Sequence, residues 1–139
     1  MAEDNSNHDA IIAFYRKALS VNAETTSTAV LEQVLAAGFR SVNSQGVKDK
    51  ATLIAQVAGF WKLIPNLKWE PQDKIVAGNK VVVRSIASGN PVGNFMGMSV
   101  DGTKAFKIDT IDIHTIENGQ IVEAYHLEDW ATAMGQLKN

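Results

Sequence analysis

The chain has 139 residues, of which 45% are hydrophobic and 20% are charged, a mixture that fills one domain core and leaves little room for a second. Its 13 basic and 15 acidic side chains give a net charge of −2, so no basic field exists to hold a phosphate backbone, and a general nucleic-acid binder is disfavoured. Cysteine is absent, which excludes disulfide scaffolds, thiolate metal sites and thiol nucleophiles. We therefore expect a single domain over residues 1–139.

The N-terminal residues are acidic and polar, and no positive region followed by an apolar run stands among them. No stretch of about 18 consecutive apolar residues occurs either. Neither a secretory signal nor a membrane span is predicted, and a cytoplasmic protein is the expectation.

The first half of the chain has a helical period. Ser6 can cap a first helix, whose apolar stripe follows at a spacing of three to four residues: Ile11, Ile12, Tyr15, Ala18 and Leu19. The Thr/Ser cluster at 25–28 can cap a second helix that stops near Gly38. A short strand at 39–42 and a third helix from about 48 to 63, ended by Pro65, are predicted next.

The second half has the period of strands. Strands are predicted over 67–77 and 80–88, then over 105–116 and from 120 to about 128, with a short helix over 130–137 closing the chain. A glycine-rich segment at 89–102 separates the two pairs and is interpreted as a mobile lid or a contact between subunits. Helices followed by a run of antiparallel strands are typical of the α+β class.

The final hairpin carries the candidate site. A three-residue turn at Glu117-Asn118-Gly119 would pair Ile116 with Gln120, and this register sets Thr110 opposite His126, Asp112 opposite Ala124 and His114 opposite Val122. Because successive side chains of a strand point to opposite faces of the sheet, one face of this hairpin is mostly apolar and consists of Ile111, Ile113, Ile121, Tyr125 and Leu127. The other face mixes apolar and titratable side chains: Phe106, Ile108, Thr110, Asp112, His114, Ile116, Val122, Ala124 and His126.

On the mixed face, Asp112 and His126 are diagonal neighbours within side-chain reach, about 7–8 Å apart at the backbone. A carboxylate raises the pKa of a nearby imidazole and orients it, which prepares an acid/base residue. We assign His126 as the acid/base group, Asp112 as its orienting partner and Thr110 as a polar contact to the ligand. The alternative, that these polar residues lie at solvated strand ends without a role, stays open.

The rest of the chain completes the expected pocket. Its apolar walls are assigned to residues spread over the chain: Phe14, Tyr15, Phe60, Trp61, Phe106 and Ile108. His114 is expected at the rim or surface, and Arg84 is expected to extend to solvent rather than bind an anion in the pocket. The three histidines do not have metal-ligand spacing, so no metal and no cofactor are expected.

Several motifs resemble the SnoaL-like polyketide cyclase family of the nuclear transport factor 2-like superfamily. They are Gly93-x-Phe95-x-Gly97-Met98, the segment from Asn118 to Glu123, Asp129, and Gln136-Leu137. The resemblance covers nearly the whole chain. It implies a cone-shaped, strongly curved antiparallel sheet that encloses a pocket, with the N-terminal helices packed on it.

In the characterised cyclases of this family, an aspartate on the last strand is the acid/base of an intramolecular aldol condensation. Aligned through the hairpin, that position is His126 here, and a histidine of the preceding strand falls on Asp112. Asp129 matches a common family aspartate and is expected to cap the last helix.

Two functions follow from the sequence. The first is a cofactor-independent cyclase or isomerase acting on a small apolar carbonyl compound, and the second is a non-catalytic protein that binds a small molecule in the same pocket. Epoxide hydrolysis ranks last, because it needs paired carboxylates with an arginine and only Asp112 is expected on that face. Relatives in the superfamily pair through the convex sheet surface, so a homodimer through Ile111, Ile113, Ile121, Tyr125 and Leu127 is expected.

Overall fold

The computed structural model describes residues 5–138. Its elements, in chain order, are α1 (Asn5–Ala13), the π-helix η1 (Phe14–Ala18), α2 (Ser27–Val34), β1 (Leu35–Asn43), β2 (Gly46–Asp49), α3 (Lys50–Leu63), β3 (Lys68–Ala77), β4 (Lys80–Gly89), β5 (Val92–Phe95), β6 (Met98–Asp101), β7 (Phe106–Glu117), β8 (Gln120–Glu128) and α4 (Trp130–Lys138). Within the described part of the chain, no helix is both long and apolar enough to cross a membrane.

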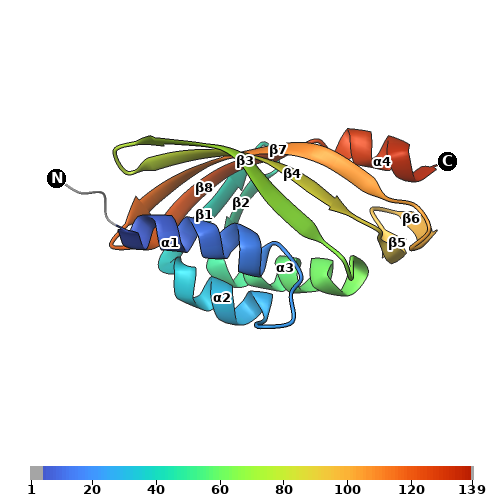
Figure 1. Ribbon diagram of the computed structural model, residues 1–139, viewed down its shortest axis with the longest axis horizontal. Coiled ribbons are helices and arrows are strands. Elements are labelled where there is room, and N and C mark those ends of the chain that lie inside the picture. The colour runs from blue at the N-terminus through green and yellow to red at the C-terminus, as the bar shows by residue number, and fades with distance from the viewer. Residues whose placement is uncertain (1–4, 139) are drawn as a thin grey trace.

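One curved, open sheet of six strands carries the fold, in the order β2-β1-β8-β7-β4-β3. The helices α1, α2 and α3 lie together on its concave side, and α4 lies at the far end beside β7 (Figure 1). This arrangement confirms the α+β class. The expectation of a purely antiparallel sheet is wrong at one pair, because β1 runs parallel to β8 and makes the sheet mixed.

The predicted N-terminal caps of α2 and α4 are present in the structure. Thr26 Oγ1 accepts a hydrogen bond from the backbone N–H of Ala29 at 3.1 Å, which caps α2. That helix ends at Val34 and not near Gly38, because Leu35 adopts an extended conformation and begins β1. Asp129 caps α4 as expected, through Thr132. The side chain of Ser6 lies outside the described residues.

Two short pieces of sheet were not predicted. The strand β2 precedes α3, so that helix begins at Lys50, capped by Asp49. The glycine-rich segment contains the hairpin of β5 and β6, a separate sheet of two strands. Phe95 of this hairpin is buried and stacks on Phe106, with ring centroids 6.0 Å apart. The hairpin is thereby anchored to the core at one end of the sheet.

The register of the last hairpin differs from the prediction. Its turn has two residues, Asn118 and Gly119, both with positive φ (52° and 74°), so Glu117 pairs with Gln120. Such primed turns match the twist of the flanking strands better than a type I turn does. The predicted pairing of Ile116 with Gln120 is therefore wrong.

A β-bulge then restores part of the predicted alternation. The register shifts between Thr115 and Ile116, and Val122 is the extra residue on β8. Beyond the bulge, Asp112 pairs with His126, and Thr110 pairs with Glu128. His126 consequently keeps its predicted face, but its direct neighbour across the hairpin is Asp112 instead of Thr110.

The convex face of the sheet carries an apolar row that crosses all six strands. Cross-strand pairs connect its members in the order Val47, Val42, Tyr125, Ile113, Val82 and Ile75. Ile111 and Leu127, a pair in the adjacent row, are also exposed. Ile121 does not belong to this face, since it precedes the bulge and is 0% exposed, which corrects the predicted patch.

Candidate active site

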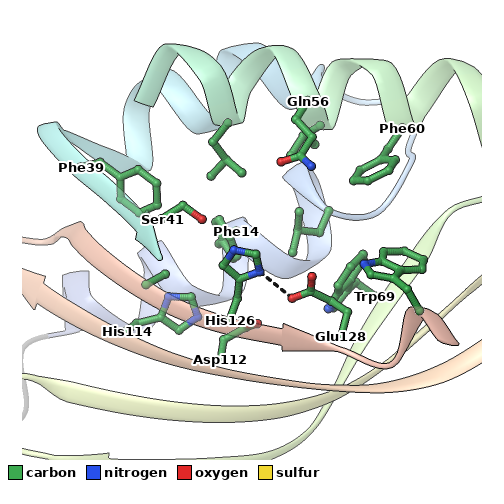
Figure 2. A pocket seen from close by; sticks show the side chains of 15 residues that line it. Phe14, Phe39, Ser41, Gln56, Phe60, Trp69, Asp112, His114, His126 and Glu128 are labelled. Carbon is green, nitrogen blue, oxygen red and sulfur yellow. Dashed lines mark hydrogen bonds and ion pairs between the residues drawn. The ribbon is translucent and has the colours of Figure 1, made fainter. Parts of the chain in front are cut away.

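A cavity of about 80 Å³ lies between the concave face of the sheet and the helices (Figure 2). Its walls come from η1, α3, α4 and four strands: Phe14, Leu19, Phe39, Ser41, Leu53, Gln56, Val57, Phe60, Trp69, Asp112, His114, Ala124, His126, Glu128 and Trp130. Apolar and aromatic side chains dominate, and the polar groups are concentrated on β7 and β8. This composition is typical of a site for a small organic molecule.

His126 and Glu128 form a pair on the floor of the cavity. They stand two residues apart on β8, so both side chains point to the concave face. His126 Nδ1 donates to Glu128 Oε2 at 2.8 Å, as the dashed line in Figure 2 shows. His126 Nε2 is buried and has no hydrogen-bond partner among the residues described. The carboxylate thus fixes the imidazole ring and leaves its second nitrogen for a ligand.

The pKa of His126 is raised above its ordinary value. The hydrogen bond to Glu128 is the largest cause, burial opposes it, and the charges of Glu128 and Asp112 add to the rise. The predicted orienting partner of His126 was Asp112. The structure gives the hydrogen-bonding role to Glu128, and Asp112 acts on the imidazole through its charge alone.

Asp112 is 5% exposed and lines the cavity beside His126. Its Oδ2 accepts a hydrogen bond of 2.5 Å from the hydroxyl of Tyr15. Burial raises the pKa of this carboxyl to about 7, although the bond from Tyr15 works in the opposite direction, and the nearby Glu128 adds to the rise. Asp112 therefore exchanges a proton near neutral pH.

His114 stands two residues beyond Asp112 on β7 and is 0% exposed, so the expectation of a rim or surface position is wrong. Its ring packs edge-on against Phe14 and Tyr15, and its Nε2 lies 2.7 Å from the hydroxyl of Tyr15. Burial lowers the pKa of His114 to about 3. The imidazole is accordingly neutral throughout the physiological range.

Comparison with known proteins connects this geometry to a family. A sequence profile described as SnoaL-like polyketide cyclase matches residues 10–137. The chain belongs to the SnoaL-like polyketide cyclase family. No curated protein sequence matches it.

Solved structures of low sequence identity share the fold of this family member. A protein of Jannaschia sp. CCS1, whose name places it among SnoaL-like polyketide cyclases, superposes with a TM-score of 0.84 at 20% identity, over 99% of this chain and 96% of that one. TsrD of Streptomyces laurentii gives a TM-score of 0.78 at 22% identity, over 99% and 98% of the two chains. IdmH of Streptomyces antibioticus gives 0.77 at 19% identity, over 96% and 99%.

Several residues predicted to touch the ligand lie behind the cavity wall. Of the six residues predicted to form the apolar wall, only Phe14 and Phe60 line the cavity. Thr110 accepts a hydrogen bond of 3.1 Å from the indole of Trp69, and the indole of Trp61 donates to the carbonyl of Ala18 at 2.8 Å. These bonds hold both side chains within the core packing.

The other predicted wall residues are core residues. Tyr15 and Ile108 are buried without lining the cavity, and Phe106 packs between Phe95 and Trp130. Sequence alternation places them on the correct face of their strand or helix. It does not show which inward side chains are covered by a second layer.

Three polar cavity residues were missed, namely Glu128, Ser41 and Gln56. Glu128 shares the i, i+2 spacing with His126, a signal that was available in the sequence. It also provides a second carboxylate on the face where only Asp112 was expected. Arg84, the arginine considered for the pocket, instead pairs with Asp73 at 2.6 Å on the outside of the sheet, as expected for a residue that extends to solvent.

Replacing Glu128 by glutamine is expected to lower the pKa of His126, because the largest cause of its rise is removed. A raised folded-state pKa stabilises the fold below the unfolded value of about 6.5, and this stabilisation is lost as pH rises through the folded value. The loss of unfolding free energy in the variant should thus be larger near pH 5.5 than near pH 9. NMR titration of the imidazole and urea unfolding at both pH values measure these effects.

Glu123→Gln is the matched control, since Glu123 also lies on β8 but pairs with Arg40 on the surface. It should leave the titration of His126 unchanged. An equal shift in both variants would contradict the pairing described above.

Proposed function

We propose that this family member catalyses acid/base chemistry on a small apolar carbonyl compound without a cofactor, with cyclisation or isomerisation as the outcome. The observation that carries the proposal is the His126–Glu128 pair, which leaves His126 Nε2 unpartnered in an apolar cavity. A base with an oriented ring and a free nitrogen is what removal of a proton beside a carbonyl group requires.

The reaction begins when neutral His126 Nε2 takes a proton from the carbon beside the carbonyl. The electron pair of the broken C–H bond becomes the C=C bond of an enolate, and the negative charge moves to the oxygen. In a cyclisation, the enolate carbon then bonds to a second carbonyl carbon of the same molecule. The alkoxide formed there takes the proton back from His126, so the product is an isomer of the substrate.

The surroundings of the pair suit this chemistry. Aromatic side chains of Phe14, Phe60, Trp69 and Trp130 line the cavity, and an apolar wall of this kind strengthens electrostatic interactions beside it because it lowers the local dielectric constant. Glu128 stabilises the imidazolium that forms during the step. The description of the family as a polyketide cyclase fits the same chemistry, because ring closure between carbonyl groups begins with loss of such a proton.

The test is exchange of carbon-bound hydrogen for deuterium in D₂O, followed by ¹H NMR of two probes, acetophenone and 1-phenylbutane-1,3-dione. We expect the protein to accelerate exchange beside the carbonyl of at least one probe above the buffer rate. Binding of both probes in NMR line broadening, with no acceleration for either, would contradict catalysis and favour the second function, a protein that only binds small molecules.

A further inference from the structure

Three buried side chains form a hydrogen-bonded chain behind the His126–Glu128 pair. The hydroxyl of Tyr15, on η1, lies 2.5 Å from Asp112 Oδ2 and 2.7 Å from His114 Nε2. Asp112 and His114 both come from β7 and line the cavity, whereas Tyr15 stands behind the wall. None of these contacts is used in the proton transfer by His126 described above.

The hydrogen bonds among His114, Tyr15 and Asp112 can have only two donor directions, because the phenol of Tyr15 has one hydrogen to donate. In the first arrangement, His114 Nε2–H donates to Tyr15, and Tyr15 donates to Asp112 Oδ2. In the second, Asp112 carries its proton on Oδ2 and donates to Tyr15, and Tyr15 donates to a bare Nε2. Neutral His114 must then carry its own hydrogen on Nδ1.

The environment of His114 Nδ1 distinguishes the two arrangements. This atom is buried and has no hydrogen-bond partner within residues 5–138. The second arrangement would leave an N–H group there, and buried N–H groups without an acceptor are rarer than buried lone pairs without a donor. A doubly protonated ring is excluded, since burial holds the pKa of His114 at about 3. The donor direction therefore runs from His114 through Tyr15 to Asp112.

We propose that His114 and Tyr15 are positioning residues that keep the acidic proton of Asp112 on Oδ1, from which Asp112 donates a hydrogen bond to the oxygen of a bound carbonyl compound. Oδ2 is occupied as an acceptor in this direction, so Oδ1 is the oxygen left for both the proton and a ligand. The inference rests on the proposed function for the identity of that ligand. It makes Asp112 a second catalytic residue, which stabilises the oxygen on which negative charge develops.

Groups on two other elements, β8 and η1, affect the protonation of the Asp112 carboxyl. Glu128 on β8 favours the protonated carboxyl, and His126 beside it opposes protonation when it is a cation. Tyr15 on η1 favours the ionised form through its hydrogen bond. With a carboxyl pKa of about 7, the donor form is lost as pH rises through neutrality, and an oxyanion should then bind more weakly.

The first experiment determines the donor direction of these hydrogen bonds in the unmodified protein. Two-dimensional ¹H–¹⁵N NMR of histidine side chains distinguishes the two neutral tautomers, and His8→Gln and His126→Gln assign the three rings. We expect His114 to carry its hydrogen on Nε2 and not to titrate between about pH 5 and 9. A hydrogen on Nδ1, or titration within that range, would overturn the proposal.

The second experiment measures donation to an oxyanion, with 3,4-dinitrophenolate as the probe and its absorbance as the readout. The His126→Gln background removes the titration of that imidazole. In this background, affinity should fall about tenfold per pH unit above the pKa of Asp112. Adding Asp112→Asn should abolish this dependence, because the amide oxygen still accepts from Tyr15 and the amide N–H replaces Oδ1–H. An equal fall with pH in both proteins, or no binding near pH 6, would refute the donor role.

The positioning role has its own pair of variants. His114→Gln keeps a side-chain N–H for Tyr15, whereas His114→Leu removes it. We expect His114→Leu to bind the phenolate about tenfold more weakly at pH 6 than His114→Gln does, and equal affinities would contradict the role. None of these three experiments needs turnover, so the role of Asp112 can be confirmed even if the deuterium-exchange test fails. Conversely, a negative result for Asp112 or His114 does not contradict proton transfer by His126.

Discussion

His126→Gln is expected to slow deuterium exchange beside the carbonyl by a factor of about 10²–10⁴, the usual contribution of a general base. Glutamine has a similar size, and its amide can still donate to Glu128, so the cavity should remain filled. The probes should therefore bind nearly as well as before. Exchange rates by NMR and affinities by titration separate the two effects, since only the rate depends on a basic nitrogen at Nε2 that can accept a proton.

The pH profile adds a second measurement to this prediction. In the unmodified protein the rate should rise as His126 loses its proton, above the ordinary imidazole range because Glu128 raises its pKa. The variant should lack that rising limb. His8→Gln is the matched control, because His8 stands on α1 and does not line the cavity. If both histidine variants keep the unmodified rate, His126 is not the base.

Ile113→Lys is expected to convert a homodimer into monomers. The convex face leaves Ile113, Tyr125 and Leu127 exposed at 41%, 48% and 69%, and complete burial of a large apolar side chain from water is worth about 1.5–3 kcal/mol. A second copy of the chain, applied through the same face about a two-fold axis, would cover the row on both subunits. Sedimentation at micromolar concentration should give twice the chain mass before the substitution and the chain mass after it.

Ile12→Lys is the control for this change. Ile12 has a similar exposed fraction, 45%, but lies on α1 and not in the apolar row of the convex face. The control should stay dimeric, and the circular dichroism spectra of both variants should match that of the unmodified protein. A monomer mass for the unmodified protein would contradict the prediction.

The sequence predicted the fold class because its helical and strand periods are separated along the chain, and because caps such as Thr26 are local signals. It did not predict the parallel pairing of β1 with β8, which joins residues far apart in the chain. It also missed β5 and β6, since Phe95 is held in place by distant aromatic partners rather than by local preference.

The candidate site was predicted in part for the same physical reason. Alternation along β7 and β8 is local, and it placed Asp112 and His126 on the concave face. The partners of these side chains depend on the register and on the second layer of packing. The two-residue turn and the bulge together exchanged Thr110 for Asp112 opposite His126, and the η1 helix brought Tyr15 between Asp112 and His114.

The bulge at Val122 makes the chemistry of this fold depend on counting residues as well as on their identity. Side chains alternate along a strand, so adding one residue to a regular part of it exchanges the two faces of everything that follows. Deletion of Val122 would remove the bulge and leave Asp112 opposite His126, whereas one residue inserted just before Tyr125 would turn His126 and Glu128 outward, and Tyr125 and Leu127 into the cavity. Insertions should therefore be tolerated in the surface loops and eliminated in β8 just before Tyr125, where one added codon removes the acid/base pair from the cavity and interrupts the apolar row.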